Sequence, residues 1–123
     1  MRICIPITGD DQVDGRWGRA HQVAVADIDD GEITGWWEHE VCWDVLHDTG
    51  SEGAHHARVA RFVREQHVGA VVAEHIGPGM MRMLRTMGIT VYLGAHGDAR
   101  QAVTVAADLG AARAGTGSAP SRR

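Results

Sequence analysis

The chain reads VGAVVAEHIGPGMMRMLRTMGITVYLG from residue 68 to residue 94, and this stretch decides the fold. The short apolar run at 68–73 is typical of a strand that is buried on both faces of a parallel sheet. Gly77 and Pro78 then open a helix, because proline at the first helical position loses no hydrogen bond there. A second apolar run follows at 89–93. The stretch therefore predicts a strand–helix–strand unit that joins two parallel strands.

Three more strands are predicted before this stretch, and they share an alternation of apolar with small or polar residues. They lie at 2–8, 21–29 and 32–41. Asp30-Gly31 is a hairpin turn dipeptide between the second and the third strand. Helical spacing of apolar residues predicts helices at 54–66 and 98–112. The order of elements predicts an α/β fold with one mixed, five-stranded sheet covered by three helices.

Length and composition limit the classes of protein. A chain of 123 residues is long enough for one hydrophobic core and too short for two, so we expect one domain at 1–112. The Gly/Ser/Pro/Arg tail at 113–123 is expected to be disordered. The net charge is −4 and no arginine patch is interleaved with aromatic residues, which argues against nucleic-acid binding. Because no apolar run approaches the roughly 20 residues of a membrane span and acidic residues come early, we expect a cytoplasmic protein.

Histidine is the most informative residue type in the chain. Seven of the eight histidines fall at or near predicted turns on the side where the parallel strands end, whereas His67 falls at the opposite end. The seven are His21, His39, His47, His55, His56, His75 and His96. Imidazole is the commonest metal ligand and titrates near neutral pH. The clustering therefore indicates metal or anion chemistry.

The best candidate ligand set combines one thiolate with three imidazoles. It consists of Cys42, His47, one of His55 and His56, and His75. Only one of the adjacent pair is expected to point inward, because neighbours project about 100° apart around a helix. Such N/S ligation suits zinc, copper or an iron-containing centre and does not suit magnesium or calcium. We therefore predict a bound transition metal or iron-containing cluster, and the absence of a CxxC pair leaves its identity open.

Four further residues in the same turns are predicted to contact the bound cofactor: Trp17, Arg19, Glu74 and Gly77. The N–H groups that follow Gly77-Pro78 at the start of the helix form an anion site. The arginine would hold an anionic ligand, although a solvated loop charge is its ordinary role.

Every residue of this set also has an ordinary structural interpretation. A single loop histidine is more often a solvated polar residue, and Cys42 could be a plain free thiol. The strand at 32–41 places Ile33, Trp37 and His39 on one face, so His39 could be a core histidine bonded to backbone. The tryptophans Trp36, Trp37 and Trp43 are expected to cover the sheet edge or the interface of a homodimer. Convergence in space is what would favour a metal site.

Several motifs together resemble the dinitrogenase iron–molybdenum cofactor biosynthesis family, which contains NifX-like metallocluster carriers and small stand-alone relatives. The matching segments are Arg2-Ile3-Cys4-Ile5-Pro6, Trp17-Gly18-Arg19-Ala20, Asp30-Gly31, Ile76-Gly77-Pro78 and Gly88-Ile89-Thr90-Val91-Tyr92-Leu93-Gly94. The resemblance covers roughly residues 1 to 110. It implies a ribonuclease-H-like sheet in the strand order 3-2-1-4-5, with strand two antiparallel to the rest. It also implies that some members bind iron–sulfur or molybdenum-containing clusters.

The chain departs from the family pattern at three places. Relatives commonly carry small residues at the position of Glu74-His75 and a Gly-rich segment at the position of His55-His56. They commonly carry Phe at the position of Trp17. Each of the first two changes adds potential ligands to the rim formed by the loops.

Three classes of function remain open. We predict a carrier or accessory protein for a transition metal or small metallocluster (Fe–S or Mo type, with Cu or Zn as other options). The alternative is a metal-dependent enzyme, with Glu74 as general base beside His75 or with Cys42 as a nucleophile paired to a histidine. A non-catalytic, pH-sensitive interaction module is the third class. A nuclease is excluded, because two-metal chemistry needs a carboxylate cluster on the central strands and the first strand has none.

Overall fold

The computed structural model describes residues 1–117, with side chains described up to residue 110. It contains five strands in one sheet, β1 (Arg2–Ile7), β2 (Gln22–Asp29), β3 (Glu32–Glu40), β4 (Ala70–Val72) and β5 (Thr90–Tyr92). The described helices are α1 (Trp43–Leu46), α2 (Glu52–Glu65), α3 (Pro78–Thr86) and α4 (Ala99–Gly117), together with a 3-10 turn, η1 (Trp17–Arg19). No helix in the described part of the chain is both long and apolar enough to span a bilayer.

The strand order β3-β2-β1-β4-β5 confirms the predicted topology. β2 pairs antiparallel with both β1 and β3, whereas β4 pairs parallel with β1 and with β5. Pro78 occupies the first turn of α3, and Gly88 follows the helix with a φ of 80° that favours glycine. These two residues delimit the helix between two parallel strands. The ribonuclease-H-like designation of this arrangement stays a prediction.

The helix count differs from the expected three. The three predicted helices are present as α2, α3 and α4, and the additional helix α1 lies between the predicted strand at 32–41 and the predicted helix at 54–66. With four residues it is too short to show a helical period in the sequence. α4 also continues to Gly117, five residues into the predicted tail, while the rest of that tail, 118–123, lies outside the described residues.

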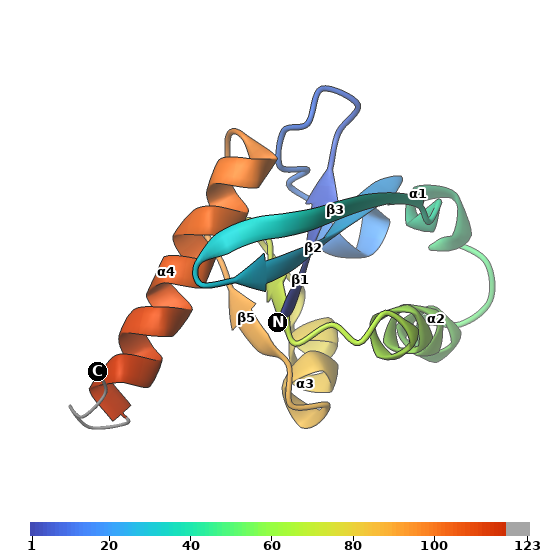
Figure 1. Cartoon of the computed structure of the whole chain (residues 1–123). Helices are drawn as coiled ribbons and strands as arrows, with labels where there is room; N and C mark the ends of the chain where they lie inside the picture. Colours follow the sequence, from blue (N-terminus) through green and yellow to red (C-terminus); the bar gives the residue numbers. More distant parts are fainter. Residues whose placement is uncertain (118–123) are drawn as a thin grey trace.

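Helices cover both faces of the sheet, with α4 on one side and α2 and α3 on the other (Figure 1). Alternate residues of β1 supply the two cores, since Cys4 packs with α2 and α3 while Ile3 and Ile5 pack with α4. Leu84 of α3 and Val103 of α4 are fully buried against these two faces. Burying each such side chain stabilises the fold by roughly 1.5–3 kcal/mol. The sheet is therefore held rigidly between two helical layers.

A β-bulge in β3 changes which face of the sheet its first residues lie on, so the predicted faces of β3 are wrong at Ile33. The register with β2 shifts at the point where Thr34 is an extra residue in β3. A bulge interrupts the alternation of side chains between the two faces. Ile33 consequently packs in the α4 core together with Trp36, although unbroken alternation predicts it on the face of Trp37.

The prediction that Trp43 covers the sheet edge or a dimer interface is wrong, because Trp43 is buried in the core.

Candidate functional site

A cleft of about 650 Å³ opens at the edge of the sheet where β1 and β4 end. Its walls come from η1, from the segment that follows α1, from the first turns of α2 and from the N-terminus of α3. Four histidines from three separate segments line it: His47, His55, His56 and His75. The topology places these segments together because the loops that follow parallel strands meet at one edge of the sheet.

His55 is the one histidine of this cleft that is fully enclosed. Only 3% of its surface is exposed, and its Nε2–H donates to the carbonyl of Gly18 across 2.8 Å. On the other side of the ring, Nδ1 accepts from the Arg58 guanidinium at 2.9 Å. Burial lowers the pKa of His55, with further lowering from the charge of Arg58. His55 is thus a neutral imidazole with both nitrogens engaged, and it joins α2 to η1.

The neighbouring residue, His56, packs against the start of α3. A Cβ placed on Gly79 would lie 3.0 Å from Cε1 of His56, so the glycine leaves room for this ring. Nε2 of His56 lies 3.8 Å from the carboxylate of Glu52, one helical turn earlier. Of the adjacent pair, His56 is therefore the residue whose ring nitrogens are not both committed to hydrogen bonds within the fold.

His47 and His75 approach the cleft from the two other segments. Nδ1 of His47 lies 3.1 Å from Oδ1 of Asp48, and this hydrogen bond lowers the pKa of Asp48. A carboxylate that accepts one ring N–H of a histidine orients the other nitrogen for a metal. The His47 ring also packs edge-on against His55, with ring centroids 5.0 Å apart. His75 is exposed on the turn between β4 and α3.

Positive charge and helix geometry complete the lining of the cleft. Arg16 and Arg19 are exposed on its η1 wall. Gly77 is the N-cap of α3 and Pro78 its first residue, so the first-turn N–H groups have no partner inside the helix. These groups carry the positive end of the helix dipole. The cleft can therefore hold an anion as well as a metal.

Trp17 lines the cleft with a buried, closely packed side chain. It is 1% exposed, and its ring meets that of Trp43 edge-on with centroids 5.2 Å apart. Trp43 in turn meets Phe62 of α2 at 5.7 Å. Among the residues that the structure describes, the buried Nε1 of Trp17 has no hydrogen-bond partner. The aromatic stack ties η1 to α1 and α2.

Glu74 lies at the margin of the cleft. Its side chain is exposed, and its Oε1 would be 2.7 Å from a Cβ on Gly15, one of the lining residues. The carboxylate thus lies over the backbone of the loop that precedes η1.

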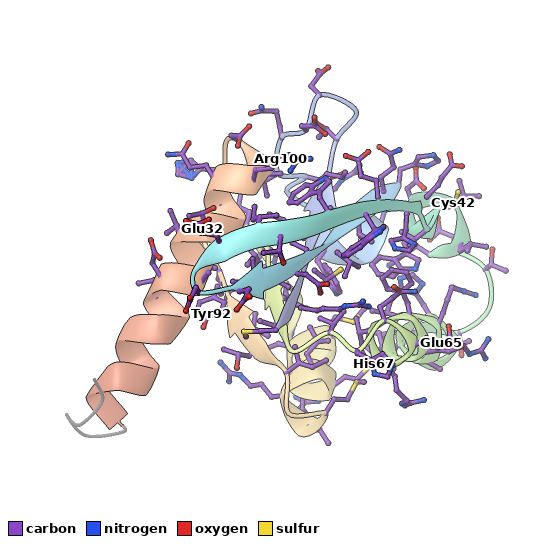
Figure 2. The ribbon with its side chains drawn as sticks, in the orientation of Figure 1. Glu32, Cys42, Glu65, His67, Tyr92 and Arg100 are labelled. Carbon is purple, nitrogen blue, oxygen red and sulfur yellow. The ribbon has the colours of Figure 1, made fainter. Side chains whose placement is uncertain are left out.

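Cys42 lies elsewhere on the same edge. It does not line the cleft, and Figure 2 shows it at the end of β3 beside α1. Its Sγ belongs to a group with His21 and Glu40 whose ligand atoms are within 4.8 Å of one another. The structure therefore brings together His47, His56, His75, Trp17, Arg19 and Gly77 and leaves Cys42 in a different cluster.

The remaining histidines divide among other surroundings. His39 packs edge-on against Phe62 at 5.3 Å, and its Nε2 has no partner among the described residues. His96 lines a separate pocket beside α4. His67 lies just after the C-terminal end of α2, away from Cys42 (Figure 2). Four of the eight histidines thus line the cleft, and the other four lie in different surroundings.

Two side chains near the cleft were missed in the sequence. Arg58 fixes the tautomer of His55, and Asp48 orients His47. Arg58 stands three residues after His55 on a predicted helix, a spacing that places the two side chains on one face. That spacing in the sequence could have indicated the contact between Arg58 and His55. The contact between Asp48 and His47 had no sequence signal apart from the two residues being adjacent.

The fold and the cleft define a small α/β domain with a histidine-lined cleft at the edge of its sheet where β1 and β4 end. The chain belongs to the dinitrogenase iron-molybdenum cofactor family, whose model matches residues 1–108. This confirms the family that the sequence motifs indicated. None of the curated proteins compared with the chain matches it significantly.

Two solved structures show the same fold. The apo form of the orange protein (ORP) from Desulfovibrio gigas has a TM-score of 0.71 and 25% sequence identity, with 87% of each chain covered. PH0822 has a TM-score of 0.70 and 20% identity, with 88% of this chain and 91% of that chain covered.

Proposed function

We propose that this protein binds a small metallocluster as cargo in the cleft and acts as a carrier or accessory protein. The observation that carries the proposal is the convergence of His47, His56 and His75 from three separate segments on one cleft. All three residues line the cleft, although among the described residues only His21, Glu40 and Cys42 form a group whose ligand atoms lie within 4.8 Å of one another. Imidazoles suit zinc, copper and iron centres.

The size of the cleft favours a cluster over a single ion. A volume of about 650 Å³ would hold roughly 20 waters at about 30 Å³ each. One metal ion with its ligands fills far less than this, so the cleft has room for a multi-atom cargo.

The basic groups of the cleft support an anionic cargo. Arg19 and the N-terminus of α3 present positive charge on two walls, whereas Arg16 is paired with Asp14, and Asp48 and Glu52 also line the cleft. Sulfide-containing iron or molybdenum clusters are commonly anions, so these groups would stabilise the cluster alongside the imidazole ligands. Membership in the dinitrogenase iron-molybdenum cofactor family supports the same class of cargo.

The surroundings of Cys42 favour a carrier over an enzyme. Burial raises the pKa of the Cys42 thiol, and the charges of Glu40 and Asp44 raise it further. A nucleophilic cysteine needs the opposite shift. Cys42 also does not line the cleft that holds His75, so the nucleophile and the proposed metal ligands are not in one site.

The proposal is tested by loading the purified protein under anaerobic conditions with ferrous iron and sulfide, or with tetrathiomolybdate. After desalting, metal per chain is measured by elemental analysis and cluster formation by absorption. We expect stoichiometric loading of the wild type and at least about tenfold weaker retention in the triple variant His47→Ala/His56→Ala/His75→Ala. His96→Ala, in a different pocket, is the matched control. Equal retention by the triple variant and the control would contradict the proposal.

A further inference from the structure

A second group of metal-binding side chains lies at the end of β3, outside the cleft. One ligand atom each of His21, Glu40 and Cys42 is within 4.8 Å of the others. None of these residues lines the cleft. The group offers one nitrogen, one oxygen and one sulfur, which is a donor set for zinc or a similar transition ion and not for magnesium or calcium.

Backbone hydrogen bonds hold the three residues in place. His21 directly precedes β2, and its neighbour Gln22 pairs with Glu40 in the sheet. The carbonyl of His21 accepts the N–H groups of Val41 and Cys42, each at 3.0 Å. The three ligands are thus anchored to paired strands and not to a free loop.

The conformation of Cys42 fixes the direction of its side chain. Its φ of 55° lies in the left-handed region, which costs a non-glycine residue about 1–2 kcal/mol. This turn ends β3 and starts α1, so that Asp44 in the first turn of α1 faces His21.

The His21 ring lies between two carboxylates. Nε2 is 2.8 Å from Oε2 of Glu40, and Nδ1 is 3.0 Å from Oδ1 of Asp44. Ionised carboxylates only accept hydrogen bonds, so both ring nitrogens must donate in this arrangement. A positive charge, here a proton, therefore occupies the position between Nε2 and Glu40. A divalent metal ion can replace that proton, while Asp44 keeps its hydrogen bond to Nδ1.

We propose that His21 Nε2, the Glu40 carboxylate and the Cys42 thiolate bind one Zn²⁺ or similar divalent transition ion, with water as the fourth ligand. Asp44 is a positioning residue, because it orients His21 through Nδ1 as the carboxylate partner of a zinc-bound histidine does. On binding, the metal displaces one proton from Nε2 and one from the thiol, and both are released to solvent.

The geometry needs only small adjustments of exposed side chains. Tetrahedral zinc with bonds of about 2.0–2.3 Å separates its ligand atoms by roughly 3.5 Å. The side chains of His21 and Glu40 are 46% and 65% exposed, so both can move by the ångström or so that is required. The same exposure gives the ion direct access from solvent.

Cobalt(II) titration of the full-length, metal-free protein tests this site. We expect one cobalt per chain with a thiolate-to-cobalt charge-transfer band and the intense visible bands of a four-coordinate ion, both displaced by Zn²⁺. Cys42→Ser should lose the charge-transfer band, and Asp44→Asn should weaken binding about 10–100-fold without removing it. Cys4→Ala, which removes the other thiol of the described chain, should keep the band. A wild type without the band, or a Cys42→Ser variant that keeps it, would overturn the proposal.

A measurement on the unmodified protein covers the case in which Cys42→Ser does not fold. Cys4 is buried, so Cys42 is the thiol open to alkylation. Zn²⁺ should slow alkylation of Cys42 at least about tenfold, as read by peptide mass spectrometry, and unchanged alkylation at saturating Zn²⁺ would overturn the proposal. The cleft variants His56→Ala and His75→Ala should bind cobalt as the wild type does. Failure at this site therefore leaves cluster loading of the cleft unaffected, and the two results are read separately.

Discussion

His55 Nε2 donates to the carbonyl of Gly18 across 2.8 Å, and this bond joins two segments that are 37 residues apart in the chain. Gly18 belongs to η1 and His55 to α2, so the bond fixes one wall of the cleft against another. A histidine of this histidine-lined cleft thus has a structural role. It joins two walls of the cleft, while its neighbour His56 lines the cleft.

Replacing His55 should cost stability more than replacing the other histidines at this edge. His55→Ala leaves the Gly18 carbonyl without its donor and opens space in a site that is 3% exposed. We expect a loss of about 2 kcal/mol in the free energy of unfolding, measured by urea denaturation. His96→Ala, on an exposed loop, should change it by less than about 0.5 kcal/mol. Equal stability of the two variants would show that the bond to Gly18 contributes nothing.

His21 and His55 should titrate on opposite sides of the ordinary histidine pKa of 6.5. Hydrogen bonds to Asp44 and then Glu40 raise the pKa of His21, whereas burial lowers that of His55. Proton NMR of the metal-free protein across pH 4–9 would resolve the two rings, with the range chosen to bracket ordinary histidine titration. Asp44→Asn should lower the pKa of His21 and leave His55 unchanged. A His21 that titrates below His55 contradicts the hydrogen bonds described.

The lowered pKa of His55 and the raised pKa of His21 make the stability of the fold depend on pH in opposite directions. The stability that His55 contributes is complete above pH 6.5 and is lost as the pH falls through its lowered folded-state pKa. The contribution of His21 is complete below pH 6.5 and is lost as the pH rises through its raised folded-state pKa. His55→Ala should therefore flatten the acid side of the stability profile, and Asp44→Asn the side above neutrality. Urea midpoints at several pH values measure both.

Cargo binding should change the fluorescence of Trp17. This tryptophan lines the cleft, and a metallocluster within contact distance would quench its emission. Trp17→Phe should remove most of the quenching while keeping an aromatic wall. Trp37→Phe is the control, because Trp37 lies on β3 and is 48% exposed away from the cleft. Quenching that is undiminished in Trp17→Phe would place the cargo elsewhere.

Arg19 of η1 should strengthen the binding of an anionic cargo through its charge. Arg19→Gln should weaken binding of tetrathiomolybdate about three- to tenfold at low salt, and added salt should reduce the difference because it screens exposed charges. Arg100 on α4 lies over Trp36 at 4.3 Å on the opposite face, so Arg100→Gln is the matched control. Isothermal titration calorimetry at two ionic strengths measures the affinity of each variant and shows whether the loss in Arg19→Gln depends on salt. An Arg19→Gln variant that binds as tightly as the control contradicts an anionic cargo in the cleft.

The architecture could be predicted from the sequence because its signals are local. The apolar run at 70–72, the Gly77-Pro78 helix start and the Asp30-Gly31 turn each act over a few residues, and the family motifs supplied the strand order. Helix α1 gave no such signal, since four residues do not complete two turns. The bulge at Thr34 likewise leaves no mark on the alternation, because it is set by pairing with β2.

The lining of the cleft could be predicted in part for the same reason. Topology alone brings His47, His56 and His75 to one edge, which is why spacing along the chain was enough to find them. The choice between His55 and His56 depended on Arg58 and Gly18, which lie on α2 and η1 and meet only in the folded protein. The separation of Cys42 from the cleft depended on its left-handed turn, which favours glycine and is not predictable for a cysteine.

X-ray absorption at the metal edge of the cluster-loaded protein tests the central claim most directly. The account predicts imidazole scattering around the metal in the wild type and in His96→Ala, and its loss in the triple variant of His47, His56 and His75. A loaded protein whose metal shows no imidazole nitrogen, or the same imidazole signal in the triple variant, would contradict it.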